Sequence, residues 1–253
     1  MGMRSCRLPK SVAVRRRALP LPLKATRVDA GSVRELAPCS RWRPRLIIMV
    51  KAPLAGQVKT RLARGIGAVA ATRFYRHASA ALVSRLTRDR RWDSRLAVAP
   101  DTAAAARFWP HHVMRMAQGR GDLGRRMRQV FKLAPPGPVV VIGSDCTDVV
   151  GADIAAAFTG LGRADAVIGP ASDGGYWLIG ARGPLRRAMP FDGIRWSSAE
   201  TRADTLANFK GWRVAMLRQL DDVDEPADLV RVEGSYQRRV PPLARSVGLQ
   251  PNT

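Results

Sequence analysis

From residue 45 onward, short apolar runs alternate with longer segments in which apolar residues recur at helical spacing. The runs predict buried strands, and the helical segments predict the connections between them. Strands are expected at 46–50, 96–99, 112–116, 139–142, 166–169, 176–180 and 214–217, and helices at about 68–86, 121–133, 153–161, 199–209 and 226–232. This alternation predicts an α/β domain of three layers, in which a mostly parallel sheet carries helices on both faces.

The two ends of the chain lack this pattern. Residues 1–44 carry eleven basic and two acidic side chains with prolines between them, which is typical of a disordered extension. The Arg-rich, acid-poor composition resembles a transit peptide, and a start codon assigned too far upstream is the alternative explanation. We therefore expect the folded domain to span residues 45–234, followed by a loose tail at 235–253.

The chain is strongly basic, with 43 Lys and Arg residues against 20 Asp and Glu residues and a net charge of +23. Such a charge attracts nucleic acid, anionic membranes or phosphorylated substrates. Most basic residues are arginines scattered along amphipathic segments, and a genome-wide bias towards Arg and Ala explains this pattern better than a nucleic-acid patch. Because no nucleic-acid-binding module is found, a non-catalytic nucleic-acid-binding protein is kept only as the alternative from a different class.

Cysteine spacing and hydropathy narrow the class of protein further. Cys6, Cys39 and Cys146 have no spacing suited to a zinc site or a disulfide framework. No apolar run approaches the 18 residues of a membrane-spanning helix. A reduced, cytoplasmic protein is therefore expected, and its oligomeric state is left open.

A single carboxylate follows the strongest predicted strand. Asp145 lies in the segment Gly-Ser-Asp-Cys at 143–146, directly after the apolar run at 138–142. Ligands of open α/β sheets bind at the carboxyl ends of the strands. Carboxylate oxygens suit Mg²⁺ or Mn²⁺, and these ions in turn suit diphosphates. Asp145 is therefore a candidate metal ligand and catalytic residue.

A basic loop follows the first predicted strand. Lys51 begins this loop, Gly56 lets the backbone approach a ligand closely, and Lys59 and Arg61 supply charges for phosphate oxygens. The loop is not a Walker A motif, which needs a second glycine immediately before its lysine. It is either a nucleotide-binding loop or a loop of solvated basic residues.

Two glycine-rich segments are further candidates. In the segment 118–127, Gly121 and Asp122 would face the nucleotide, or Asp122 would cap the helix that follows. The second segment lies after another strand and would line the acceptor or sugar through Asp173, Gly174, Gly175 and Tyr176. A plain hairpin turn explains this second segment without any function.

The last candidate segment, at 220–226, is acidic. Three of its residues, Asp221, Asp222 and Asp224, are carboxylates within four positions of a cationic chain. If the segment lies beside Asp145, Asp222 and Asp224 are candidate ligands of the same metal. One of the three is expected to cap the helix that begins at Pro226.

Five of these segments, in this order, resemble one protein family. They are residues 51–62, 118–127, 143–146, 169–176 and 222–229. Together they are similar to bacterial GT-A-like transferases associated with radical-SAM and selenium-domain genes, and also to phospholactate guanylyltransferase and, more distantly, molybdenum-cofactor guanylyltransferase. The resemblance covers residues 45 to about 232. It implies a nucleotide-diphospho-sugar transferase fold that holds a nucleotide at the first strand–helix loop.

The resemblance also implies roles for the matched residues. Those that would face the base and phosphates are Gly56, Lys59 and Arg61. The principal metal ligand would be Asp145 and the second Asp222 or Asp224, and the acceptor or sugar would contact Asp173, Gly174 and Gly175. The chain departs from the family at Thr147, where a proline is expected after the cysteine. This substitution loosens the loop without removing a ligand.

The leading hypothesis is a Mg²⁺- or Mn²⁺-dependent transferase that uses a nucleotide-activated donor, with glycosyl transfer ahead. Lys59 and Arg61 would hold the nucleotide, and Asp145 and Asp224 the metal, which neutralises charge on the leaving group. Asp173 is the candidate general base. The alternative is transfer of a nucleotidyl group from an NTP to a phosphorylated small molecule. The expected partners are a nucleotide or nucleotide sugar and an unidentified small-molecule acceptor.

Overall fold

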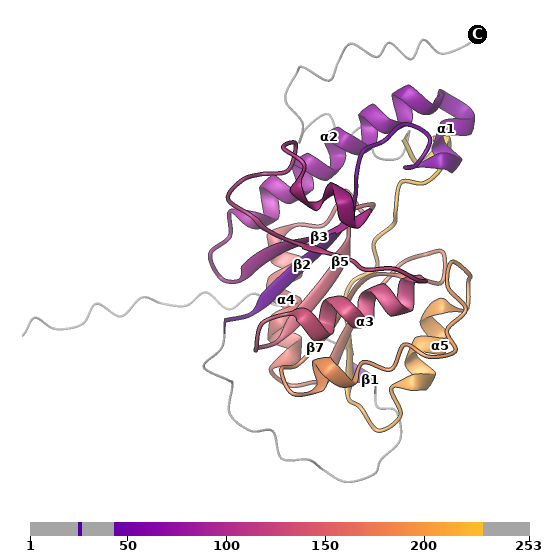
Figure 1. The fold of residues 1–253 in the computed structure, drawn as a ribbon. Coiled ribbons are helices and arrows are strands. Elements are labelled where there is room, and N and C mark those ends of the chain that lie inside the picture. The colour runs from indigo at the N-terminus through magenta and orange to yellow at the C-terminus, as the bar shows by residue number, and fades with distance from the viewer. Residues whose placement is uncertain (1–24, 27–42, 230–253) are drawn as a thin grey trace, which may run out of the picture.

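The computed structural model describes residues 25–26 and 43–229, which form one twisted sheet with helices on both faces (Figure 1). The eight strands lie in the order β1-β8-β6-β7-β5-β2-β3-β4. The predicted α/β architecture with a mostly parallel sheet is confirmed. Among the described residues, no helix is both long enough and apolar enough to span a membrane.

Most neighbouring strands are parallel. The parallel pairs are formed by β2 (Arg45–Lys51), β3 (Asp93–Ala99), β4 (Met114–Ala117), β5 (Val139–Gly143), β6 (Ala166–Pro170) and β8 (Val214–Met216). Strand β7 (Tyr176–Ala181) lies between β5 and β6 and is antiparallel to both. The five residues between β6 and β7 are too few for a parallel crossover, so these two strands form a hairpin.

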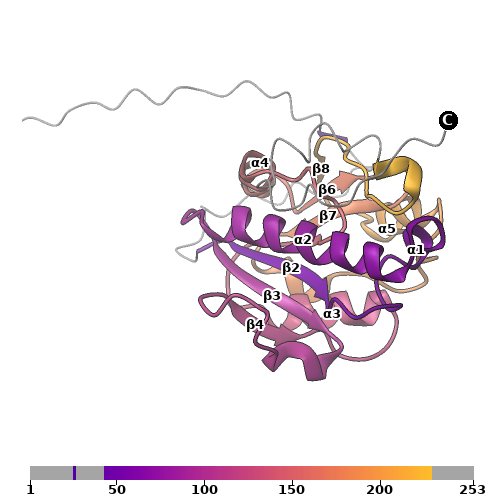
Figure 2. The same cartoon turned by 90° about the horizontal axis from the view of Figure 1, so that it is seen from above.

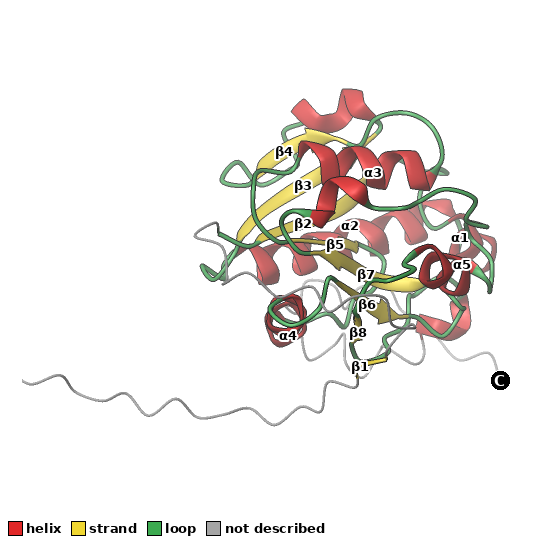
Figure 3. Cartoon of the chain, turned by 90° about the horizontal axis from the view of Figure 1, so that it is seen from below, coloured by secondary structure: helices red, strands yellow, loops and turns green. Residues whose placement is uncertain are grey.

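The helices divide between the two faces of the sheet (Figures 2 and 3). One face is covered by α2 (Ala68–Thr87) and α4 (Gly151–Leu161), and the other by α3 (Leu123–Leu133) and α5 (Thr201–Asn208). Side chains of β2 alternate accordingly, because Ile48 packs in the first core and Ile47 in the second. Burial on both faces explains why the strands appear in the sequence as continuous apolar runs.

The remaining elements are short. Helix α1 (Thr60–Ile66) precedes α2, and Gly67, with a φ of +84°, separates the two helices. Two 3₁₀ turns, η1 (Asp101–Ala105) and η2 (Leu185–Ala188), lie in connections. A separate helix at 60–66 was not predicted, and its seven residues include a glycine and two exposed arginines and show no long apolar stripe.

Two predicted boundaries fall partly outside the described residues. The helix expected at 226–232 is helical at 226–229, and its remaining residues are not described. Most of the expected extension at 1–44 and the whole tail at 235–253 are likewise outside the described ranges. Within the extension, β1 (Ala25–Thr26) pairs with β8 as an antiparallel edge strand.

All the candidate segments lie at one edge of the sheet. The strands β2, β4, β5, β6 and β8 run in the same direction, because β7 is antiparallel to both β5 and β6. Their carboxyl ends therefore share one edge, and each of the five candidate segments follows one of these strands. This edge is where open α/β sheets bind ligands.

Candidate active site

A buried lysine joins two carboxylates at the carboxyl edge of the sheet. Nζ of Lys59 lies 2.6 Å from Oδ1 of Asp145 and 2.8 Å from Oδ1 of Asp224. The side chain of Lys59 is 4 % exposed, whereas those of Asp145 and Asp224 are 46 % and 43 % exposed. The ammonium group thus lies below two carboxylates that solvent, or a ligand, can reach.

The backbone of Lys59 adopts an unusual conformation to place this ammonium group. Its φ of 49° and ψ of 47° lie in the left-handed region, at the position just before α1. This conformation costs a non-glycine residue roughly 1–3 kcal/mol, and such residues cluster at functional sites. Burial tends to lower the pKa of Lys59, but the charges and hydrogen bonds of Asp145 and Asp224 outweigh it and raise the pKa. The lysine is therefore a permanent cation.

The acidic segment after β8 rests on helix α1. A Cβ atom at Gly65 would collide with the ring of Pro226, so a side chain other than hydrogen has no room there. The backbone amide of Val223 faces the carbonyl oxygen of Asp145 at 3.5 Å. These contacts place the acidic segment beside Asp145, and Figure 1 shows the gold C-terminal ribbon reaching α1.

The start of the last helix is stabilised by a residue inside it. Oδ2 of Asp228 accepts hydrogen bonds from the backbone amides of Asp224 and Glu225, both at 2.9 Å. The sequence assigned the cap of this helix to one of the three carboxylates before Pro226, and Asp228 contributes these two hydrogen bonds from inside the helix. The side chain of Asp224 is thereby left to bind Lys59.

A third carboxyl group belongs to the same electrostatic cluster. Burial raises the pKa of Asp222 to about 7, and the nearby charges of Asp145, Asp224 and Asp173 add to this rise while Lys59 opposes it. Asp173 comes from the β6–β7 turn. The four carboxyl groups predicted as catalytic or metal-binding residues are therefore near one another.

A tyrosine that sequence reasoning missed holds two of the loops together. The hydroxyl of Tyr75 accepts a hydrogen bond from the amide of Lys51 at 2.8 Å and lies 3.0 Å from Oγ of Ser144. Burial raises the pKa of Tyr75 to about 12, so the hydroxyl keeps its proton. In the sequence, Tyr75 occupies a core position of the predicted helix and so looks like an ordinary core residue. The one indication of its role is that a buried tyrosine hydroxyl usually has a hydrogen-bond partner.

The first glycine-rich segment fixes strand ends and caps α3. Nε2 of Gln118 donates hydrogen bonds to the carbonyl oxygens of Val50 at 3.0 Å and Ala97 at 2.8 Å. Oδ1 of Asp122 accepts a hydrogen bond from the amide of Arg125 at 2.8 Å. Asp122 thus caps α3, which is the structural alternative considered for it, and Gly121 has a φ of +103°.

The second glycine-rich segment is a tight hairpin turn beside the acidic segment. Oδ1 of Asp173 accepts a hydrogen bond from the amide of Gly175 at 2.8 Å. The amide of Ser172 faces Oδ1 of Asp221 at 3.3 Å and links the turn to the acidic segment. Gly174, with a φ of +84°, lies against the backbone of Ala199, where a Cβ atom would collide.

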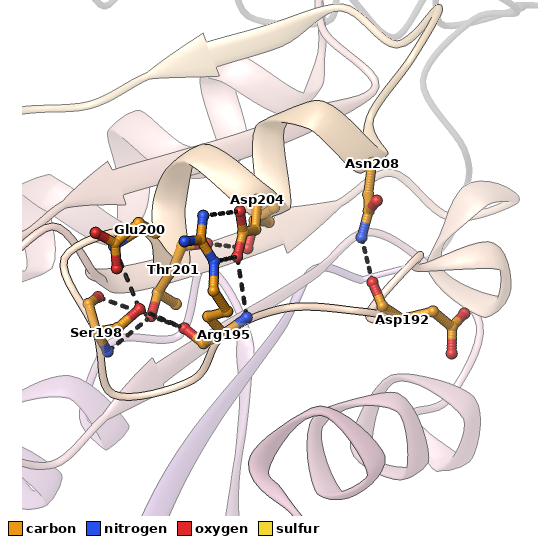
Figure 4. Close-up of polar contacts among 8 residues, drawn as sticks. Asp192, Arg195, Ser198, Glu200, Thr201, Asp204 and Asn208 are labelled. Carbon is orange, nitrogen blue, oxygen red and sulfur yellow. Dashed lines mark hydrogen bonds and ion pairs between the residues drawn. The ribbon is translucent and has the colours of Figure 1, made fainter.

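The loop that supports this turn is tied to α5. Arg195 forms an ion pair with Asp204 at 2.9 Å, and the hydroxyl of Thr201 donates a hydrogen bond to the carbonyl oxygen of Arg195 (Figure 4). Tyr176, expected on the acceptor side, has its hydroxyl buried next to Thr205 without a well-formed hydrogen bond among the described residues. Its hydroxyl therefore faces the protein interior.

The remaining predicted nucleotide-binding residues lie on either side of Lys59 in the sequence. Lys51 and Arg61 are exposed, and they lie respectively at the end of β2 and in the first turn of α1. Gly56 has a φ of +76° and open space around its missing side chain. The segment around Lys59 thus carries two exposed positive charges.

Comparison with known proteins identifies the family. Residues 82–198 match a family model described as an uncharacterized protein conserved in bacteria (DUF2064). A crystal structure of a presumed nucleotide-diphospho-sugar transferase from Desulfovibrio desulfuricans G20 is 32 % identical, with a TM-score of 0.71, and the match covers 78 % of this chain and 91 % of that one. The chain belongs to the nucleotide-diphospho-sugar transferase-like family. This membership makes the protein a nucleotide-using transferase and an enzyme.

More distant solved structures share the transferase fold. The 4-diphosphocytidyl-2C-methyl-D-erythritol synthase from Anaerococcus prevotii DSM 20548 is 11 % identical with a TM-score of 0.52, and the match covers 77 % of this chain and 96 % of that one. A CMP:2-keto-3-deoxy-manno-octonic acid synthetase complexed with CTP is 8 % identical with a TM-score of 0.52. The match covers 79 % of this chain and 100 % of that one. No curated protein matches the chain. At these identities, the likeness extends to the fold alone.

The donor set at the transferase's carboxyl edge fits a divalent metal that arrives with phosphates. Among residues 25–26 and 43–229, no group of three or more His, Cys, Asp or Glu side chains is arranged to hold a metal by itself. Mg²⁺ is usually bound by one or two carboxylates together with substrate phosphates and waters. Asp145 and Asp224 provide two carboxylates that already converge on one cation, which matches this requirement.

Proposed function

We propose that the protein is a Mg²⁺- or Mn²⁺-dependent transferase that moves a glycosyl group from a nucleotide-diphospho-sugar to a small-molecule acceptor. The observation that carries the proposal is the convergence of Asp145 and Asp224 on the ammonium group of Lys59. These three residues come from loops after three different strands of the sheet. Two carboxylates that face one cationic centre at this edge favour chemistry on a diphosphate.

Each residue would have a distinct role. Asp145 and Asp224 would hold the metal, which when bound neutralises charge on the diphosphate leaving group. Lys51, Lys59 and Arg61 would bind the phosphate oxygens as point and forked charges. Asp173 would accept the proton of an acceptor hydroxyl, because its turn lies against the acidic segment through Ser172.

Nucleotidyl transfer from an NTP is the second candidate, and one observation favours it. Three cationic side chains lie in or next to a single loop, namely Lys51, Lys59 and Arg61. Lys59 and Arg61 flank the start of α1. A triphosphate carries more charge than a diphosphate and would use all three. The distant relative with CTP bound shares the fold and shows that this fold accommodates an NTP.

Product analysis distinguishes the two reactions. The full-length protein would be incubated with Mn²⁺ and either a panel of nucleotide sugars or the four NTPs, together with extracts of small molecules as acceptors. Release of a nucleoside diphosphate from a nucleotide-diphospho-sugar supports glycosyl transfer, whereas release of pyrophosphate from an NTP supports nucleotidyl transfer. Asp145→Asn should abolish either release, and the matched variant Asp192→Asn should not, because Asp192 is exposed and pairs with Arg128 away from the site. Equal turnover by wild type and Asp145→Asn would contradict the proposed site.

A further inference from the structure

The geometry points to a second role for Lys59. We propose that its ammonium group occupies the cation position between Asp145 and Asp224 in the nucleotide-free enzyme, and that it moves to the donor phosphates when metal and nucleotide bind together. Lys59 therefore prevents the site from filling with metal alone. This inference rests on the proposed function, because it requires that the two carboxylates are the metal ligands.

The first step is that the ammonium group and a metal would compete for the same atoms. Nζ of Lys59 contacts Oδ1 of Asp145 at 2.6 Å and Oδ1 of Asp224 at 2.8 Å. A Mg²⁺ ion binds carboxylate oxygens at about 2.0–2.1 Å. The ammonium group and a divalent ion bound to the same two oxygens would repel each other, so each weakens the binding of the other.

The second step is that this position of Lys59 is built into the fold. The side chain is 4 % exposed, and the left-handed backbone at φ 49° aims it at the carboxylates. The neighbouring Lys51, by contrast, is exposed. The two carboxylates in turn are almost half exposed, so a ligand can reach them without unfolding the loop.

The third step is that the ammonium group of Lys59 can bind other anionic groups when the donor is present. A lysine side chain is a flexible four-carbon stem with a compact charge, which can exchange one anionic partner for another. The phosphates of a donor held by Lys51 and Arg61 would lie next to it and replace the two carboxylates as its partners. Metal and nucleotide would then favour each other's binding, because each removes the ammonium group from the carboxylates.

The test is a Mn²⁺ titration of the full-length protein, followed by electron paramagnetic resonance of the free ion. Wild type, Lys59→Met and Lys59→Arg would be compared with and without ADP, GDP, UDP or CDP. Without nucleotide, Lys59→Met should bind Mn²⁺ at least about tenfold more tightly than wild type, because the competing charge is gone. Lys59→Arg keeps the charge and should remain weak. Lys210→Met is the matched control, because Lys210 is exposed after α5 and should leave Mn²⁺ affinity unchanged.

The outcomes separate this inference from the proposed function. If wild type binds Mn²⁺ with a nucleotide but folded Lys59→Met gains no affinity without one, the inference is wrong and the proposed function stands. If Lys59→Met gains affinity for Mn²⁺ but no nucleotide changes Mn²⁺ binding in any variant, the release of Lys59 by nucleotide and the proposed function both fail. If Lys59→Met does not fold, wild type alone decides, since Mn²⁺ binding that is equally tight with and without every nucleotide would overturn the inference.

Discussion

Oδ1 of Asp224 lies 2.8 Å from Nζ of Lys59, although the two residues are 165 positions apart in the sequence. The contact joins the loop after β2, the first strand of the parallel core, to the segment after β8, the last. The candidate site therefore forms only when the segment after β8 packs against the loop after β2. Changes that displace the acidic segment should lower ligand affinity even when they leave the sheet intact.

Replacing the glycine beneath the acidic segment tests this dependence. Gly65→Ala should place a methyl group against Pro226 and push Asp224 away from Lys59. We expect overpacking of about 1–3 kcal/mol and at least a tenfold loss of Mn²⁺-dependent nucleotide affinity. Calorimetric titration and thermal unfolding would measure both effects.

The control for this variant is Gly151→Ala, at the start of α4. A Cβ atom there meets only ordinary contacts, the nearest at 3.5 Å. The Gly151→Ala variant should therefore leave ligand affinity unchanged and slightly stabilise α4. Gly65→Ala that binds nucleotide as tightly as Gly151→Ala would show that the acidic segment does not complete the site.

Removal of one tyrosine hydroxyl should loosen the two loops that carry Lys51 and Asp145. Tyr75→Phe leaves the buried Ser144 hydroxyl and the amide of Lys51 without this partner. The expected loss in the free energy of unfolding is about 1–3 kcal/mol. Tyr176→Phe is the matched control and should cost less, because the Tyr176 hydroxyl is buried without a well-formed hydrogen bond among the described residues. Equal losses in urea unfolding would contradict the role of Tyr75.

The turn that carries Asp173 should depend on Gly174 for space and not only for conformation. Gly174→Ala would collide with the backbone of Ala199 as well as strain a φ of +84°. Gly193→Ala strains a similar φ of +67° but meets open space. Gly174→Ala should therefore lower the melting temperature more than Gly193→Ala, by several degrees, which reflects about 1–3 kcal/mol of overpacking. If the two variants melt at the same temperature, the packing against Ala199 contributes nothing.

The contribution of Asp222 to the stability of the metal-free protein should fall as pH rises from 4 to 7. Because burial raises the pKa of Asp222 to about 7, the folded protein holds a proton in this range that the unfolded chain releases near pH 4. The contribution of Asp222 to stability is thus fully present below pH 4 and is lost as pH rises through 7, by at most about 1.4 kcal/mol per pH unit. Urea unfolding in the presence of EDTA would measure this slope.

The variant Asp222→Asn isolates this contribution from other titrating groups. Its amide carries no proton to release, so the difference in unfolding free energy between variant and wild type should change in favour of the variant between pH 5 and pH 8. A pH-independent difference would mean that Asp222 is ionised in the folded protein across this range.

The sequence predicted the layers of this fold well because both faces of the sheet are buried. Continuous apolar runs such as 139–142 mark strands that pack against helices on two sides, and they were placed correctly. The antiparallel direction of β7 followed only from the hairpin turn considered as the alternative for the second glycine-rich segment, and the structure has this hairpin. Helix α1 was missed because it has no long local apolar stripe, and its contact with Pro226 comes from far along the chain.

The candidate site was predictable in its components but not in its contacts. Asp145, Asp224 and Lys59 were each identified from their places after strands, but spacing alone does not reveal that the lysine lies between the two carboxylates. The capping role of Asp228 was missed because three carboxylates nearer to Pro226 were available for it.

The most direct test of the central claim is a calorimetric titration of the full-length protein with nucleotide sugars and NTPs, with and without Mn²⁺. We predict Mn²⁺-dependent binding of a nucleotide ligand that is lost in both Asp145→Asn and Asp224→Asn and retained in Asp192→Asn. Binding that is independent of Mn²⁺, or that survives in Asp145→Asn and Asp224→Asn, would contradict the claim that these two carboxylates hold a metal–nucleotide complex.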